Sequence, residues 1–177
     1  MLYMYFGKNF QILHERTEEI MYQIGDRIVH PLHGAGIISE IVTQKVDREK
    51  RDYYLLHLPE NNMDVLVPVE TADKIGIRPV GTAEKAEAAF RTIREFEVTY
   101  GANWNVRYHE NISRIKSGDL EEVAKVIKIL SVFDREKGLA SGERKMLHNA
   151  KKILFSELAL ILDRSYAEME ATLQELI

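Results

Sequence analysis

The chain has 177 residues, of which 45% are hydrophobic and 29% are charged, values that are ordinary for a globular protein. It contains no cysteine, which excludes disulfides, thiolate metal sites and a cysteine nucleophile. No apolar run approaches membrane-spanning length, and the formal net charge of −4 argues against a polyanionic partner if the charge is averaged over the chain.

The first twenty residues, MLYMYFGKNFQILHERTEEI, start with apolar side chains and carry charges soon after. They lack the basic, then apolar, then small-residue order of a signal peptide. We expect residues 1–20 to be an N-terminal extension, from an upstream start or similar to a tag, that lies outside the fold.

Residues 21–78 have the pattern of short β-strands. The β-branched runs DRIVHP and AGIISEIVTQKV are separated by the turn-prone LHGAG, and the charged turn VDREKR follows. The runs DYYLLHL and DVLVPV flank PENNM, whose Asn61-Asn62 pair suits a hairpin that needs positive φ. About five short strands predict a small barrel of the SH3 or Tudor kind, a class that often binds partners along an exposed strand edge.

Residues 79–177 have a helical hydrophobic period. Residues that favour helix starts precede the predicted helices, and these are Asn103, Asp119, Ser141 and Ser165, the last with Glu168 at capping-box spacing. The helix after Asp119 has the widest apolar stripe, so we expect it to be central. The predicted fold class is α+β with two domains, a small SH3/Tudor-like β-barrel followed by an all-α helical bundle.

Trp104 is the only tryptophan and lies in the first turn of the helix that Asn103 starts. On a helical wheel Trp104 lies between an apolar stripe and a polar, basic stripe. The apolar stripe contains Tyr108, Ile112 and Ile115. The polar and basic stripe contains Arg107, Asn111 and Arg114. One interpretation is that Trp104 closes the bundle core, as large aromatic residues usually do. The other is an apolar wedge that enters the minor groove of DNA while nearby cations hold phosphates.

Positive charge is concentrated in one part of the chain. Residues 91–152 contain thirteen Lys and Arg against nine Asp and Glu, whereas residues 153–177 contain one against five. On the long helix after Ser141, one face carries Arg144, His148, Lys151 and Lys152, with Lys145 adjacent. A solvated basic face is the ordinary interpretation, but cations at two helix starts also suit a polyanion.

Residues for catalysis are not recognisable. We find no set of nucleophile, base and orienting group, and no glycine loop that would cradle a phosphate. His30, His33 and His57 lack a carboxylate or cysteine that would complete a metal site. We therefore expect a protein that is not an enzyme and that holds no metal and no cofactor.

Three segments carry a resemblance to a known family. YQIGDRIVHPLHGAGIISEI, ANWNVRYHENISRIKSGDL and EKGLASGERKMLHNAKKIL, in this order and spacing, resemble the CarD/CdnL family of bacterial transcription regulators. The similarity runs from about residue 21 to residue 177. The N-terminal half also resembles the polymerase-interacting domain of the transcription-repair coupling factor.

The resemblance implies that the barrel binds the β subunit of RNA polymerase by extending its sheet. The implied polymerase-facing positions are Thr43, Gln44, Lys45, Val65, Leu66 and Val67. Some family members have arginines where Gln44 and Leu66 stand, so this interface would rely more on strand pairing and apolar fit.

The resemblance also implies that the helical domain approaches promoter DNA at the upstream edge of the transcription bubble. Trp104 matches the family's wedge, which enters the minor groove and hinders bubble collapse. The implied basic contacts are Arg107, His109 and Arg144, with Lys145 beside the last. Recognition of this kind would depend little on base sequence.

The resulting hypothesis is a regulator of transcription initiation that stabilises the open promoter complex. It would be cytoplasmic, at the nucleoid through RNA polymerase, with no membrane and no small-molecule substrate. The alternative is a protein–protein adaptor on RNA polymerase in which Trp104 is structural and does not touch DNA. A free-standing DNA-binding protein is a third possibility, although nothing resembles a helix that reads the major groove.

Overall fold

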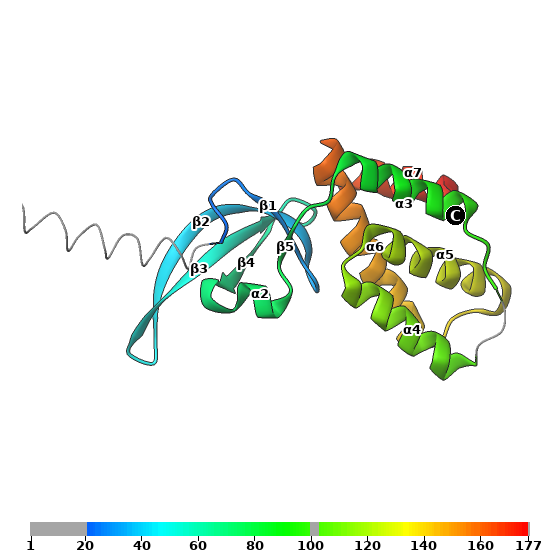
Figure 1. Cartoon of the computed structure of the whole chain (residues 1–177), viewed down its shortest axis with the longest axis horizontal. Coiled ribbons are helices and arrows are strands. Elements are labelled where there is room, and N and C mark those ends of the chain that lie inside the picture. The colour runs from blue at the N-terminus through cyan, green and yellow to red at the C-terminus, as the bar shows by residue number, and fades with distance from the viewer. Residues whose placement is uncertain (1–20, 100–102, 177) are drawn as a thin grey trace, which may run out of the picture.

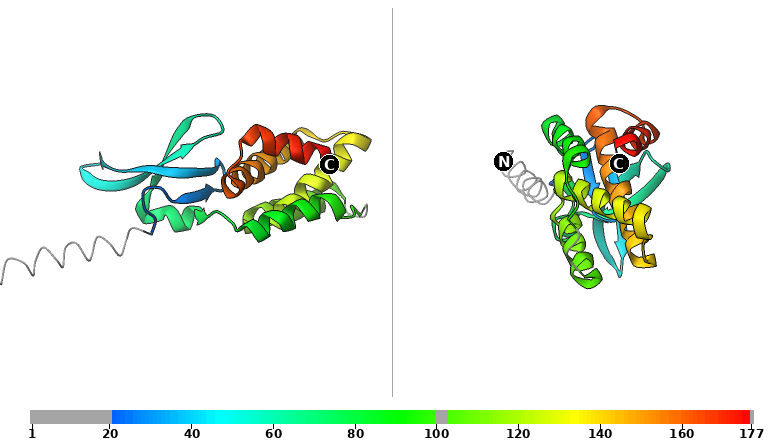
Figure 2. Two further views of the ribbon diagram at one scale, coloured as in Figure 1. Left: turned by 90° about the horizontal axis from the view of Figure 1, so that it is seen from above. Right: turned by 90° about the vertical axis from the view of Figure 1, so that its right-hand side faces the viewer.

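The computed structural model describes residues 21–99 and 103–176, so the predicted extension of residues 1–20 lies outside the described residues. An antiparallel sheet comes first in the chain and a group of helices follows (Figure 1). Seen from above, the two parts lie end to end along the long axis of the molecule (Figure 2). The predicted two-domain α+β fold class is confirmed.

The sheet has five antiparallel strands in the order β4-β3-β2-β1-β5. The strands are β1 (Arg27–His30), β2 (Gly34–Val46), β3 (Glu49–Leu58), β4 (Met63–Pro68) and β5 (Arg78–Pro79). After β4 the chain forms a 3₁₀ turn (Val69–Thr71) and the short helix α2 (Ala72–Ile75) instead of continuing the ladder. Because β4 and β5 stay at opposite edges, the sheet is open rather than a closed barrel within the residues described.

The predicted turns lie where the strands reverse. Asp47 and Arg48 both have positive φ between β2 and β3, and Asn62 has a φ of 51° before β4. The β2–β3 ladder continues past the end of β4, because Tyr53 pairs with Pro68 whereas Asp52 pairs only with Thr43. The β2–β3 hairpin therefore projects beyond the rest of the sheet (Figure 1).

The helical domain has five helices in the described residues. They are α3 (Ala83–Glu95), α4 (Trp104–Ser117), α5 (Leu120–Lys137), α6 (Ser141–Leu162) and α7 (Tyr166–Leu176). The predicted central helix is α5, which packs against α3, α4 and α6 and buries most of its apolar side chains. None of the helices in residues 21–99 and 103–176 combines the length and apolar character needed to cross a membrane.

Local capping explains most helix starts. The side chain of Asn103 accepts a hydrogen bond from the Val106 amide at 3.0 Å, and Asp119 accepts from the amides of Glu121 and Glu122. Ser165 and Glu168 form the expected reciprocal capping box. The prediction for Ser141 is wrong by one position: Ala140 is the N-cap residue and provides no side-chain bond.

An ion pair joins the two domains. Arg78 of β5 donates two hydrogen bonds to Glu157 of α6, at 2.6 and 2.7 Å, and the carboxylate also accepts from the Gly81 amide at 2.9 Å. Glu157 is completely buried. A carboxylate taken out of water in this way requires its partners, so removal of Arg78 would leave a costly buried charge.

Strands β1 and β2 also pack directly on α6. Val29 and Ala35 form an apolar cluster with Ile153, and the Ala35 amide donates to the hydroxyl of Ser156 at 2.8 Å. Arg27 pairs with Asp163 at 2.8 Å. These contacts fix the orientation of the sheet relative to the helices.

Candidate functional site

The N-termini of α4 and α6 lie at the same end of the helical domain. Arg107 in α4 contacts Glu143 in α6, and further along the same two helices Ile115 and Ile153 meet in one apolar cluster. The helices therefore run in the same general direction. Their unpaired backbone N–H groups make this end of the domain favourable for anions.

Trp104 is the first residue of α4, and 44% of its surface is exposed. Its ring stacks on Tyr108, with 5.1 Å between centroids and 23° between planes. Tyr108 in turn packs against the core of the helical domain. The indole is thus a supported surface ring and does not close the bundle core.

Arg107 does not lie on the exposed basic stripe that the helical wheel indicated. Its Nε and Nη2 donate to one carboxylate oxygen of Glu143 at 2.9 and 2.7 Å, and its guanidinium lies 4.2 Å from the centroid of the Phe133 ring. Only 16% of the Arg107 side chain is exposed, and Glu143 is buried. Arg107 is therefore placed to hold α4 against α6.

The rest of the polar stripe is also occupied inside the domain. Asn111 is 1% exposed, and Arg114 pairs with Glu122 at 3.4 Å. Arg107, Asn111 and Arg114 therefore face neighbouring helices, whereas the exposed residues of α4 include its first turn and also His109, Glu110, Ser113, Lys116 and Ser117. Helical periodicity alone indicated the two stripes but not which of them faces inwards.

The exposed basic residues near Trp104 are His109, Arg144 and Lys145. Arg144 donates from Nη2 to the Leu139 carbonyl oxygen at 2.7 Å, which orients its guanidinium in the first turn of α6. The basic face predicted on α6 continues through His148, which is exposed, to Lys151 and Lys152, which are half-buried. Cations therefore border the exposed indole from α6.

Two residues of this site were not singled out from the sequence as functional. Tyr108 was assigned only to the apolar stripe, although it supports the indole. Glu143 gave no distinctive signal, because acidic residues are common in first helical turns whether exposed or buried.

A second candidate surface lies on the sheet domain. Within the described residues β4 pairs only with β3, so its other edge keeps backbone groups available for an added strand. Leu66 is 41% exposed and Val65 is half-buried, whereas Val67 is buried in the sheet core. Of the three predicted β4 residues, Val67 could meet a partner only through its backbone.

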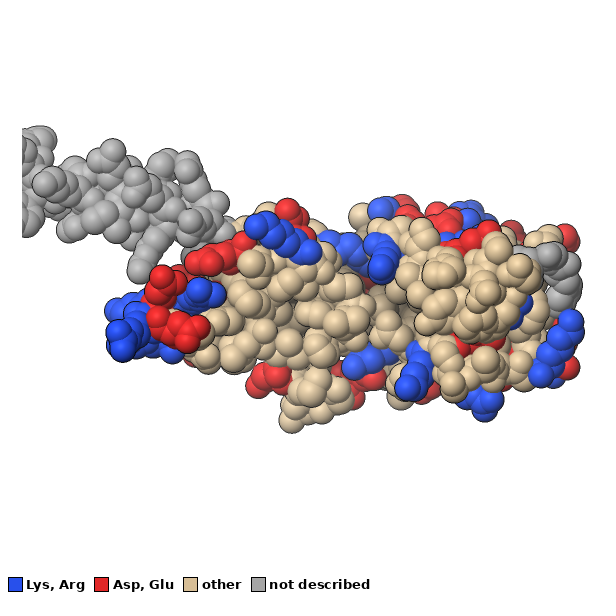
Figure 3. Space-filling view, turned by 90° about the horizontal axis from the view of Figure 1, so that it is seen from below, with Lys and Arg blue, Asp and Glu red and all other residues tan. Residues whose placement is uncertain are grey.

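The other three predicted polymerase-facing residues lie on the β2 arm of the projecting hairpin. Thr43, Gln44 and Lys45 are all exposed, and the Thr43 hydroxyl donates to Asp52 at 2.6 Å. Lys and Arg side chains gather at this end of the molecule, mixed with acidic side chains (Figure 3). The β4 edge and the exposed β2 arm of the hairpin are separated in the sheet by β3, and both belong to the sheet domain.

Comparisons with known proteins identify the family. Residues 22–81 match the family model described as "CarD-like/TRCF RID domain", and residues 88–174 match "CarD, C-terminal domain". The chain is 38% identical over 141 residues to the Bacillus subtilis (strain 168) protein named "Putative transcription factor YdeB". The aligned region covers 80% of this chain and 92% of that protein. The chain belongs to the CarD family.

The CarD family consists of transcription factors associated with RNA polymerase and is not known for enzymatic activity. The resemblance found in the sequence is thereby confirmed. The two family models match in the same order as the sheet and the helices. The β4 edge and the hairpin fall within the first match, and Trp104 with its neighbouring cations falls within the second.

Proposed function

We propose that this CarD-family protein binds the β subunit of RNA polymerase through its sheet and stabilises the open promoter complex with Trp104. The observation that carries this proposal is the position of the indole. It is 44% exposed, supported by Tyr108, and located where two helix N-termini and exposed cations meet. The adaptor alternative, with Trp104 in the core, is less well supported because the ring is not buried.

The first step is attachment to RNA polymerase. The edge of β4 offers its backbone to a strand of the β subunit, with Leu66 and Val65 supplying apolar contact. The exposed hairpin residues Thr43, Gln44 and Lys45 extend this surface. Attachment would place the protein at the nucleoid through the polymerase.

The second step is insertion of the indole between base steps at the upstream edge of the bubble. Unstacking costs a few kcal/mol for each step, so other contacts have to offset it. Arg144 and Lys145 in the first turn of α6 and His109 in the second turn of α4 would contact phosphates, and the helix N-termini favour the same anions. Arg107 contributes by positioning α4.

Tethering explains how a chain with a net charge of −4 can act on DNA. Once the sheet is bound to the polymerase, DNA contact becomes an intramolecular event with a high effective concentration. The few cations near Trp104 then suffice, and contact in the minor groove requires little base recognition.

The decisive experiment measures the lifetime of open complexes formed by RNA polymerase on a promoter in the presence of each variant. Loss of a wedge contact worth about 1.4 kcal/mol shortens the lifetime about tenfold, which is the expected result for Trp104→Ala. Val106→Ala is the matched control, because Val106 is 45% exposed in the same helical turn but has no stacked partner among the described residues.

Binding to the polymerase, measured on the same samples, should be equal for both variants. An unchanged lifetime with a folded, polymerase-bound Trp104→Ala variant would contradict the proposal. Loss of polymerase binding by that variant would instead favour an adaptor role for this surface.

A further inference from the structure

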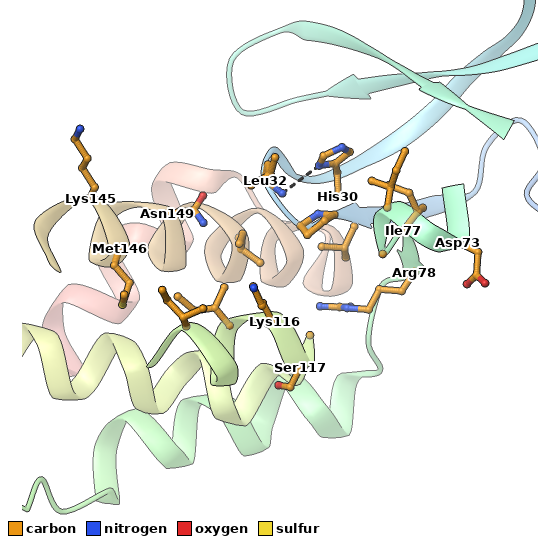
Figure 4. Close-up of a pocket in the computed structure, with 18 of the residues that line it drawn as sticks. His30, Leu32, Asp73, Ile77, Arg78, Lys116, Ser117, Lys145, Met146 and Asn149 are labelled. Carbon is orange, nitrogen blue, oxygen red and sulfur yellow. Dashed lines mark hydrogen bonds between the residues drawn. The ribbon is translucent and has the colours of Figure 1, made fainter. Parts of the chain in front are cut away.

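A cavity of about 910 Å³ lies where the two domains meet. Its walls come from the β1–β2 turn, from the segment between α2 and β5, and from α4 and α6 (Figure 4). We propose that this cavity binds a small amphipathic molecule with an apolar body and an anionic head group. Such a molecule would be a regulatory ligand and not a substrate.

The size and lining of the cavity suit a small molecule. Ligand sites commonly occupy about 300–1,000 Å³, lie between domains and are mostly apolar with a few polar groups. Apolar side chains from both domains line this one, and they include Ile77, Ile112, Ile115, Met146 and Ile153. An apolar body placed here would contact the sheet domain and the helical domain at once.

The charged residues of the lining favour an anion. The Lys116 ammonium group is directed into the cavity from α4, whereas the side chains of Lys145 and Asp73 are directed away from it (Figure 4). Arg78 also lines the cavity, but its guanidinium is already bound to Glu157. Lys116 has no acidic partner in the part of the chain that the structure describes, which leaves its charge available to a ligand.

Tyr108 connects the cavity with Trp104. It lines the cavity and also stacks on the indole, with 5.1 Å between the ring centroids. An occupant that shifts the Tyr108 ring would therefore change the surroundings of the only tryptophan. Binding can be detected in this way whether or not the proposed action on DNA is correct.

The probe for the test is 8-anilinonaphthalene-1-sulfonate, which combines an aromatic body with one negative charge. Added to the full chain, it should bind with one-to-one stoichiometry and show emission sensitised by energy transfer from Trp104. Decanoate should displace the probe at a concentration about tenfold lower than decanol, because only decanoate has an anionic head. Equal displacement by the two would overturn the anionic part of the proposal.

Filling the cavity tests its location. A Cβ atom added at Gly142 would meet Tyr108 at 3.5 Å, an ordinary contact, and a leucine in a helix is more favourable than a glycine. We expect Gly142→Leu to fold and to weaken probe binding about tenfold. Ser141→Leu is the control, since it adds the same side chain at an exposed neighbouring position outside the lining.

Equal probe affinity of the two leucine variants would overturn the proposed site. Reversing one charge tests the head group: Lys116→Glu should weaken binding of the anionic probe about tenfold and leave the dissociation constant of decanol unchanged. Lys85→Glu makes the same charge change on the exposed start of α3 and should leave the affinity unchanged. An equal effect of both reversals would mean that net charge, and not the cavity, attracts the probe.

Discussion

Arg107 and Glu143 join the first turns of α4 and α6 through a buried ion pair, with the shortest bond at 2.7 Å. The Phe133 ring covers the guanidinium, so the pair is largely shielded from water. Trp104 lies one helical turn before Arg107, and Arg144 directly follows Glu143. This contact therefore helps to position the indole relative to the cations on α6.

Removal of one partner of this pair should destabilise the protein strongly. Glu143→Ala leaves the Arg107 charge without its partner inside the protein, so we expect the free energy of unfolding to fall by about 3–5 kcal/mol. Urea unfolding of the variant measures this change. Glu110→Ala, an exposed position on α4, is the control and should change it by less than about 0.5 kcal/mol.

The double variant Arg107→Met with Glu143→Leu separates the cost of a broken pair from the contribution of the intact pair. We expect it to recover most of the lost stability, because apolar residues of similar volume often replace a buried pair at little cost. A double variant as unstable as Glu143→Ala alone would show that the charges themselves are required.

Leu66 should be important for binding to the polymerase if the proposed function is correct. Leu66→Asp places a charge on the exposed side of the edge strand, and we expect the affinity for the β subunit to fall about tenfold or more. Ile24→Asp is the control, because Ile24 is 62% exposed but lies outside β4 and the hairpin. Pull-down or titration with the isolated β subunit measures both; equal affinities would refute the β4-edge interface.

Protonation of His30 should destabilise the protein at low pH. Burial, with a smaller contribution from His33, lowers the pKa of His30 from 6.5 to about 4, and its neutral Nδ1 accepts hydrogen bonds from the amides of Leu32 and His33. A lowered pKa means that this stability is complete above pH 6.5 and decreases as the pH falls towards 4. The pKa shift corresponds to as much as about 3 kcal/mol.

His30→Asn isolates this effect from the titration of carboxylates. An asparagine oxygen can accept the same backbone bonds, but it does not become charged. The free energy of unfolding, measured between about pH 7.5 and pH 4.5, should decrease less in the variant than in the native protein. Parallel pH profiles for the two proteins would exclude His30 as the cause.

Asn111 should be replaceable with a gain in stability. Its side chain is 1% exposed, and neither its nitrogen nor its oxygen has a hydrogen-bond partner within the described residues. Burial of an unsatisfied amide costs about 1–3 kcal/mol, so Asn111→Leu, which has similar volume, should raise the free energy of unfolding by an amount of that order. Thermal unfolding measures the change, and a lower melting temperature would indicate that the amide is satisfied in solution.

The parts of the fold that could be predicted from the sequence depend on neighbours in the chain. Asn103 and Asp119 mark helix starts because their side chains bond to amides only two or three residues away. Asn62 marks a turn because few residues other than glycine tolerate positive φ. The α+β class followed from these local signals together with the change of hydrophobic period.

The parts that could not be predicted depend on residues far apart in the chain. Arg107 had the pattern of an exposed cation, and only its partner Glu143, 36 positions later, turns it inwards. Closure of the sheet likewise depended on whether β4 and β5 would meet, and no local pattern determines that. Trp104 could be placed on the boundary between two faces, but its exposure depended on how α4 packs.

The Arg78–Glu157 ion pair holds the sheet domain against the helical domain. Because the two domains are held together, the β4 edge and the Trp104 indole stay at one distance from each other. If the protein acts as proposed, a polymerase bound to the β4 edge would bring the indole to the same base step on each promoter. Promoters would then differ in their response according to how easily that base step unstacks. A variant that weakens the Arg78–Glu157 pair would lose this difference between promoters before it lost binding to the polymerase or contact with DNA.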